Sequence, residues 1–208
     1  MSEKKTAVLP AAPFGMVIKN LLHPLAYFRS VNGRARRGEY WTTALLVALP
    51  VYTLLMIFTI LSVSCRSVAL FVVLSLPLSV LGLLMIPVTI RRWHDLGVTG
   101  WLIVVCLGIM GFPCQAIPVA GPILAFLLGV PWLVFFCLPG RKGDNAYGAD
   151  PRDPAAVDPP GSRKEPWLPL ILTTFGMSLT SWGWSIYSVY KSIETLRRME
   201  MYSSLFSF

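Results

Sequence analysis

Charged residues are scarce in this sequence, and long stretches contain none. Asp, Glu, Lys and Arg make up 13% of its 208 residues, whereas a soluble domain usually carries roughly a quarter. Hydrophobic residues make up 55%. This composition argues against a single soluble core and indicates several transmembrane helices.

Acidic residues are scarcer than basic ones. The chain has 10 Asp and Glu against 18 Lys and Arg, which gives a formal net charge of +8. In a soluble chain this excess would suggest nucleic-acid binding. Here the basic residues flank apolar runs, where such residues orient helices in the bilayer and meet anionic lipid headgroups. We therefore expect membrane lipids as partners, and no nucleic acid.

Residues that ligate metals or act as nucleophiles are also few. His23 and His94 are far apart in the sequence, and the four cysteines form no CxxC pair. The sequence contains no Gly-rich nucleotide loop and no serine motif of the hydrolase type. We therefore expect no metal ion and no cofactor, and the sequence favours a non-enzymatic function.

The apolar runs predict an all-α integral membrane helical bundle with a four-span core at residues 31–151. The first span is expected from about Trp41 to Leu61. The second is expected from about Val68 to Ile90, where prolines and a glycine should bend it. Residues 101–138 are too long for one helix and should hold two short spans around a Gly/Pro-rich hairpin at 111–121.

Segments on either side of this core complete the predicted organisation. Residues 1–30 combine a tail with an interfacial amphipathic helix at about Phe14 to Phe28, and prolines there argue against a cleavable signal peptide. Residues 152–166 should form a cytoplasmic linker, residues 167–190 a fifth transmembrane helix, and residues 191–208 a C-terminal tail.

The distribution of Lys and Arg predicts the orientation of the helices. These residues are abundant before the first span, sparse after it, present again after the second span and abundant in the linker. The N-terminus and the linker should therefore lie in the cytoplasm. A fifth span would place the C-terminus outside, where Lys191, Arg197 and Arg198 conflict with the rule.

This orientation brings three polar segments to the cytoplasmic side. They are GRARRGEYW at the start of the first span, RRWHDLGVTGW at the end of the second, and LPGRKGDNAYG at the end of the fourth. We call their polar residues the polar cluster. Its members are Arg34, Arg36, Arg37, Glu39, Arg91, Arg92, His94, Asp95, Arg141, Lys142, Asp144 and Asn145.

In this order and spacing, the three segments resemble the domain of unknown function 805 family, the YhaH-like small bacterial inner-membrane proteins. The resemblance covers about residues 27–151. It implies a four-helix bundle in a bacterial inner membrane and no established reaction. The fifth span and the linker before it lie outside the pattern.

The polar cluster allows more than one interpretation. His94 beside Asp95 could be a base with an orienting carboxylate. Adjacent residues on a helix point about 100° apart, however, so Asp95 more simply neutralises a nearby arginine while His94 fills the interface. The arginines either bind the phosphate of lipid headgroups or act only as positive-inside anchors.

The expected fifth helix carries a stripe of small hydroxyl side chains. Such stripes favour close helix–helix packing in lipid. The stripe either packs on the protein's own bundle or docks another membrane protein or a second copy. Its members are Thr174, Ser178, Ser181, Ser185, Ser188 and Ser192.

Two of the cysteines fall in connections that should face outward. The outer side of an inner membrane is oxidising, so the sequence permits a disulfide between Cys65 and Cys114.

Together these features favour an accessory or interaction subunit of the inner membrane, without enzymatic activity. The fifth helix would dock a membrane partner, and the basic cytoplasmic face would contact lipid headgroups or that partner. One alternative is a small transporter, channel or export component that uses the bent second span. Another is a membrane enzyme that acts on lipid headgroups through His94 and Asp95.

Overall fold

The computed structural model describes residues 31–110, 120–153 and 158–205, together with Gly15, Ile18, Lys19, Leu22 and Arg29. These residues form helices and no strand, apart from one isolated bridge between Asn145 and Gly148. The expected all-α class is confirmed for this part of the chain. The interfacial helix expected at 14–28 and the hairpin expected at 111–121 lie largely outside it.

The first helical run is continuous over 28 residues, Arg37–Ser64. It consists of α3 (Arg37–Thr43), a π-helical turn η1 (Ala44–Ala48) and α4 (Leu49–Ser64). Pro50 has no N–H to donate to the carbonyl four residues earlier, so the regular ladder is interrupted where η1 meets α4. The helix expected for the first span is thus found, with an added turn at each end.

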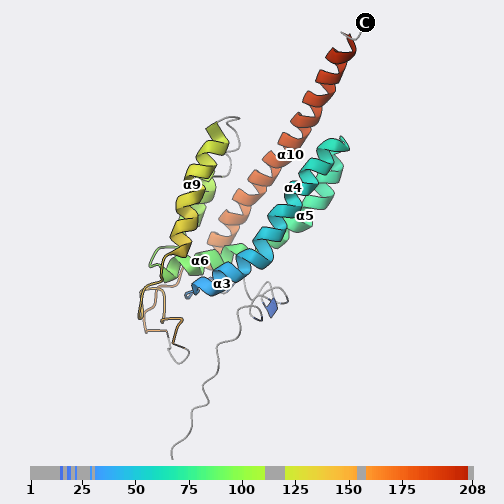
Figure 1. Ribbon diagram of the computed structural model, residues 1–208. Coiled ribbons are helices and arrows are strands. Elements are labelled where there is room, and N and C mark those ends of the chain that lie inside the picture. The colour runs from blue at the N-terminus through green and yellow to red at the C-terminus, as the bar shows by residue number, and fades with distance from the viewer. Residues whose placement is uncertain are drawn as a thin grey trace, which may run out of the picture.

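The second run, Val68–Asp95, has the same length but contains a break. Helix α5 (Val68–Gly82) ends before a turn at Leu83, and α6 (Met85–Asp95) continues in a new direction. In Figure 1, α3 and α6 lie across one end of the molecule, and α4, α5, α9 and α10 extend from that end. We call it the polar end.

Three further helices complete the described fold. They are α7 (Leu102–Met110), α9 (Ala120–Cys137) and α10 (Trp167–Leu205). Helix α7 contacts α9 and α10, and α10 also packs along α4 and α5. Within the described residues, Arg37–Ser64 and Val68–Asp95 are long and apolar enough to cross a membrane, whereas the apolar helix Phe126–Cys137 is shorter.

Helix α10 does not end where the sequence predicted. The expected span stopped at Tyr190, but the helix continues to Leu205, over 39 residues in total. Two contacts explain the extension. Ile193 is buried in a cluster with Phe71, and Glu194 accepts hydrogen bonds from Lys191 at 2.8 Å and Arg198 at 2.5 Å, pairs that stabilise a helix.

Candidate functional site

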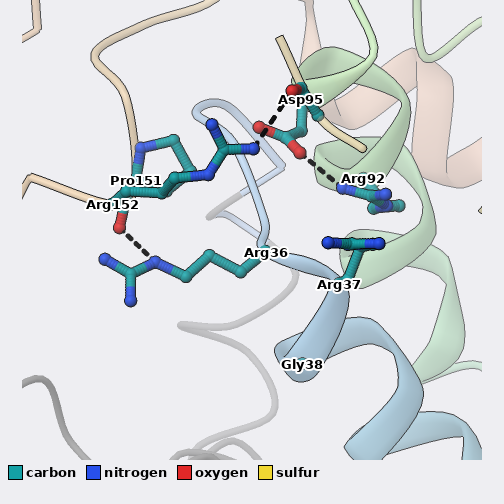
Figure 2. A pocket seen from close by; sticks show the side chains of 8 residues that line it. Arg36, Arg37, Gly38, Arg92, Asp95, Pro151 and Arg152 are labelled. Atoms are coloured by element: carbon teal, nitrogen blue, oxygen red, sulfur yellow. Dashed lines mark hydrogen bonds and ion pairs between the residues drawn. The ribbon is translucent and has the colours of Figure 1, made fainter. Parts of the chain in front are cut away.

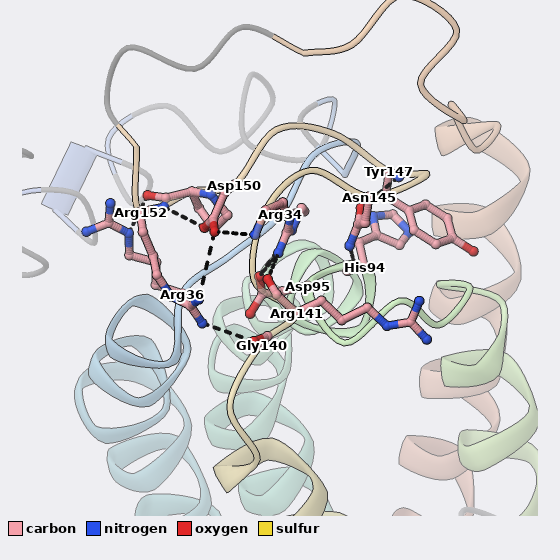
Figure 3. A network of polar contacts seen from close by, with 12 residues as sticks. Arg34, Arg36, His94, Asp95, Gly140, Arg141, Asn145, Tyr147, Asp150 and Arg152 are labelled. Carbon is pink, nitrogen blue, oxygen red and sulfur yellow. Dashed lines mark hydrogen bonds and ion pairs between the residues drawn. The ribbon is translucent and has the colours of Figure 1, made fainter.

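The polar end brings together the three segments that form the polar cluster. Helix α3 begins there, α6 ends there, and the chain leaves α9 there (Figure 3). Beneath it, Tyr40 of α3 stacks on Phe136 of α9 with ring centroids 4.3 Å apart, and Trp93 of α6 packs against the same phenyl ring. This aromatic layer fixes the three elements relative to one another.

Asp95 is the buried centre of the ion network. Arg34 donates to its Oδ1 from Nε at 3.1 Å and from Nη2 at 2.9 Å. Arg92 pairs with Oδ2. Burial of a carboxylate requires such pairing, and one acid here serves two guanidinium groups. Asp95 therefore neutralises arginines, as the simpler interpretation of the sequence has it.

The chain after α9 closes over this ion pair. The backbone N–H of Arg141 donates to the carbonyl of Asp95 at 2.9 Å. A Cβ atom at Gly140 would lie only 1.8 Å from Asp95 Oδ2, so no side chain fits at position 140. The glycine is needed for this close approach, and Arg34 ties down the same segment by donating to the carbonyl of Gly143 at 2.6 Å.

His94 points away from Asp95. Its Nδ1 lies 3.0 Å from the carbonyl oxygen of Gly33, which can only accept, so Nδ1 carries the proton. Tyr147 stacks on the imidazole at 4.3 Å, nearly parallel to it. The side chain is fully buried. His94 and Asp95 thus have separate partners and do not form a base–carboxylate pair.

Sequence reasoning missed Glu165, as it missed Arg152. Glu165 was expected in a solvated linker, yet it is buried, and its Oε2 lies 3.4 Å from His94 Nε2. Thr99 donates to its Oε1 at 2.6 Å, and the N–H of Gly100 lies 3.1 Å from both oxygens. Its position just before the fifth apolar run was the only local signal.

The charge of Glu165 is well compensated. Burial alone would raise the pKa of its carboxyl group, but the nearby His94 ring and the hydrogen bonds from Thr99 and the Gly100 N–H outweigh burial and hold the pKa below its usual range. Its own N–H donates to Asn32 Oδ1 at 2.9 Å. Glu165 therefore fastens the start of α10 to the core through an ionised, buried carboxylate.

Of the remaining members of the polar cluster, Glu39 is buried and the others are half-buried or exposed. Glu39 pairs with Arg91, and Asn145 donates to the carbonyl of His94 at 2.8 Å. Asp144 accepts from the N–H of Asp150 at 3.0 Å. Lys142 is exposed. The polar cluster is thus a buried ion network under a more open basic surface.

A pocket of about 200 Å³ opens beside this network (Figure 2). Four arginines line it, from the start of α3 and the residue before it, from α6 and from the segment after α9, and Asp95 is the one acid in its lining. Three of the guanidinium groups touch a carbonyl or carboxylate of the lining, and that of Arg37 donates to the carbonyl of Cys137 at the end of α9. The arginines are Arg36, Arg37, Arg92 and Arg152.

The hydroxyl stripe of α10 turns gradually away from the bundle. Thr174 is fully buried, Ser178, Ser181 and Ser185 are half-buried, and Ser188 and Ser192 are exposed.

Of the two cysteines in the permitted disulfide, Cys65 is exposed at the α4–α5 turn, and Cys114 lies outside the described residues, so the disulfide stays a prediction.

Two long, exposed apolar helical runs that share a polar end define a helical membrane protein. The family described as protein of unknown function (DUF805) matches residues 28–149, and the chain belongs to that family. The inner membrane protein YhaI of Escherichia coli strain K12 is 31% identical over 134 residues, which cover 63% of this chain and 93% of YhaI. YhaI of strain O157:H7 matches equally.

No solved structure matches this chain. The family match ends at residue 149. Arg152, Glu165 and α10 therefore lie beyond it, although two of them, Arg152 and Glu165, complete the polar end.

Proposed function

We propose that this protein is a non-enzymatic accessory subunit of the bacterial inner membrane. It crosses the membrane several times, with its N-terminus and polar end in the cytoplasm. Its basic face contacts anionic lipid headgroups, and α10 docks a membrane protein. The inner-membrane location follows the relatives, and the excess of arginine at the polar end supports the orientation.

The observation that carries the docking role is the exposed side of α10. Leu170, Val189 and Ile193 bury one side of the helix against the bundle. The end of the hydroxyl stripe, at Ser188 and Ser192, is exposed beside these contacts. A membrane helix can approach such small side chains closely.

Several hydroxyl groups of the stripe donate to the backbone of their own helix. Ser185 donates to the carbonyl of Ser181 at 3.0 Å, and Ser192 donates to the carbonyl of Ser188 at 2.9 Å. A partner helix can therefore cover Ser185 and Ser192 without leaving either hydroxyl donor unsatisfied.

Site-specific photo-crosslinking in cells tests the docking role. A photoreactive phenylalanine analogue is placed at Ser188, at Ser192 or, as a control, at Gly183. Gly183 lies about 180° around the helix from Ser192, and a Cβ there has no neighbour within 4 Å. We expect a protein adduct of one discrete mass at Ser188 and Ser192 and none at Gly183. No protein adduct at either serine, or the same adduct at Gly183, would refute docking by the stripe.

A further inference from the structure

We propose that the arginine pocket is a binding site for a single anionic phosphate group. This proposal rests on the proposed contact between the basic face and lipid headgroups. It assigns that contact to the arginine pocket and to the phosphate group of the headgroup. Four arginines and one aspartate line the pocket, so its side chains carry a net charge of +3. Like charges this close are unfavourable without a counter-anion.

The one acid in the lining is already engaged. Asp95 gives Oδ1 to Arg34 and Oδ2 to Arg92. Its charge is therefore already shared between these two guanidinium groups. Arg36, Arg37 and Arg152 are the guanidinium groups that line the pocket without pairing to Asp95 (Figure 2). Of these, Arg152 also pairs with Asp150, which is not part of the lining, at 3.8 Å between Nη1 and Oδ2.

These three guanidinium groups are held in place before any ligand arrives. Arg36 Nε donates to the carbonyl of Pro151. Arg37 Nη1 donates to the carbonyl of Cys137 at 3.3 Å, and Arg152 Nη2 donates to the carbonyl of Gly140 at 3.0 Å. A guanidinium has five N–H donors, so each arginine keeps further donors for phosphate oxygens. A pre-positioned fork of donors suits phosphate.

The place and size of the pocket favour a headgroup. The apolar run Arg37–Ser64 begins at the pocket, the run Val68–Asp95 ends at it, and α9 ends at Cys137, three residues before its lining residue Gly140. The pocket therefore sits at the depth of lipid phosphates. Its volume of about 200 Å³ equals that of roughly seven water molecules, which accommodates a phosphate with a small polar substituent but no acyl chain.

Thermal unfolding of the purified full chain in mild detergent, followed by tryptophan fluorescence, measures binding because a ligand of the native state stabilises it. The probes are phosphatidic acid, phosphatidylglycerol, zwitterionic phosphatidylcholine and inorganic phosphate. We expect the two anionic lipids to raise the unfolding temperature and phosphatidylcholine to leave it unchanged. If inorganic phosphate stabilises the chain and the lipids do not, the site stands, and its ligand is a soluble phosphate compound.

Variants that each remove one positive charge, inside or outside the pocket, distinguish binding in the pocket from general electrostatic attraction of the anionic probes to the basic face. Arg152→Gln and Arg37→Gln change exposed residues of the pocket, and each should weaken apparent affinity about tenfold through the loss of a charged hydrogen bond. Lys142→Gln removes the same charge at an exposed position outside the pocket and should have under about a twofold effect.

An equal loss of affinity in Lys142→Gln and Arg152→Gln would overturn the proposal, as would the absence of stabilisation by any anionic probe. Either result leaves the photo-crosslinks at Ser188 unaffected, so failure of this site is distinguishable from failure of the docking role.

Discussion

The buried carboxylate of Asp95 leaves no room for a side chain at position 140. In Gly140→Ala, the new Cβ would lie 1.8 Å from Oδ2 and 2.5 Å from Cγ of Asp95, far inside the normal contact distance of about 3.5 Å. The carboxylate must then withdraw from Arg34 or Arg92, or the segment after α9 must lift away. The first movement separates a buried ion pair, and the second breaks the hydrogen bonds that tie the segment to Asp95 and Arg34.

The loss of one partner from a buried ion pair costs about 3–5 kcal/mol. For a chain of this size, each kcal/mol shifts the unfolding temperature by about 2–4 °C. A cost near the lower figure therefore lowers the unfolding temperature of Gly140→Ala by roughly 6–12 °C.

Thermal unfolding in detergent, followed by tryptophan fluorescence, measures this shift. Gly183→Ala is the matched control, because its Cβ meets nothing within 4 Å and it lies inside α10, where alanine favours the helix by about 1 kcal/mol. The control should unfold at or slightly above the wild-type temperature. If Gly140→Ala unfolds together with Gly183→Ala, the close approach of Gly140 to Asp95 is wrong.

Three further substitutions test the contacts that hold the polar end and α10. The pKa of Glu165 is lowered in the folded chain, so its stabilisation is present above the unfolded pKa of about 4.3 and disappears as the pH falls through the folded value. Glu165→Gln should lower the unfolding temperature at pH 7, and its difference from wild type should shrink below about pH 4; a constant difference across pH would contradict this. Arg34→Lys loses the two-pronged contact with Asp95 and should cost roughly 2 kcal/mol in a urea titration, while Lys142→Arg should change nothing. Trp182→Phe removes the hydrogen bond from Nε1 to Ser75 Oγ, 3.0 Å long, and should lower the unfolding temperature by about 2–4 °C.

Hydropathy was a good guide to the helices of the core. The uncharged runs predicted Arg37–Ser64 and Val68–Asp95 to within a few residues at most ends. Hydropathy locates such helices well because nearly every residue along an apolar helix is hydrophobic. The same reasoning stopped α10 at Tyr190, since polarity rises there. Contacts of Ile193 with the bundle and ion pairs along the helix continue it.

The sequence predicted that the three polar segments lie together at the polar end, but not which of their side chains form ion pairs and hydrogen bonds. Topology alone brought the ends of three helices together. Which residues pair depends on the directions of their side chains and on partners that are distant in the sequence. Such contacts leave no periodic pattern in the sequence. Glu165 lies 71 positions from His94 along the chain, in a stretch that reads as solvated linker, and its partner became evident only from the 3.4 Å contact.

The mass and composition of the native particle, extracted in mild detergent and measured by native mass spectrometry, test the proposed function most directly. We expect a second polypeptide, or a second copy of this chain, at a fixed ratio, together with retained anionic phospholipid. A particle that contains one copy of this chain, no other polypeptide and no anionic lipid would contradict both the docking role of α10 and the headgroup role of the polar end.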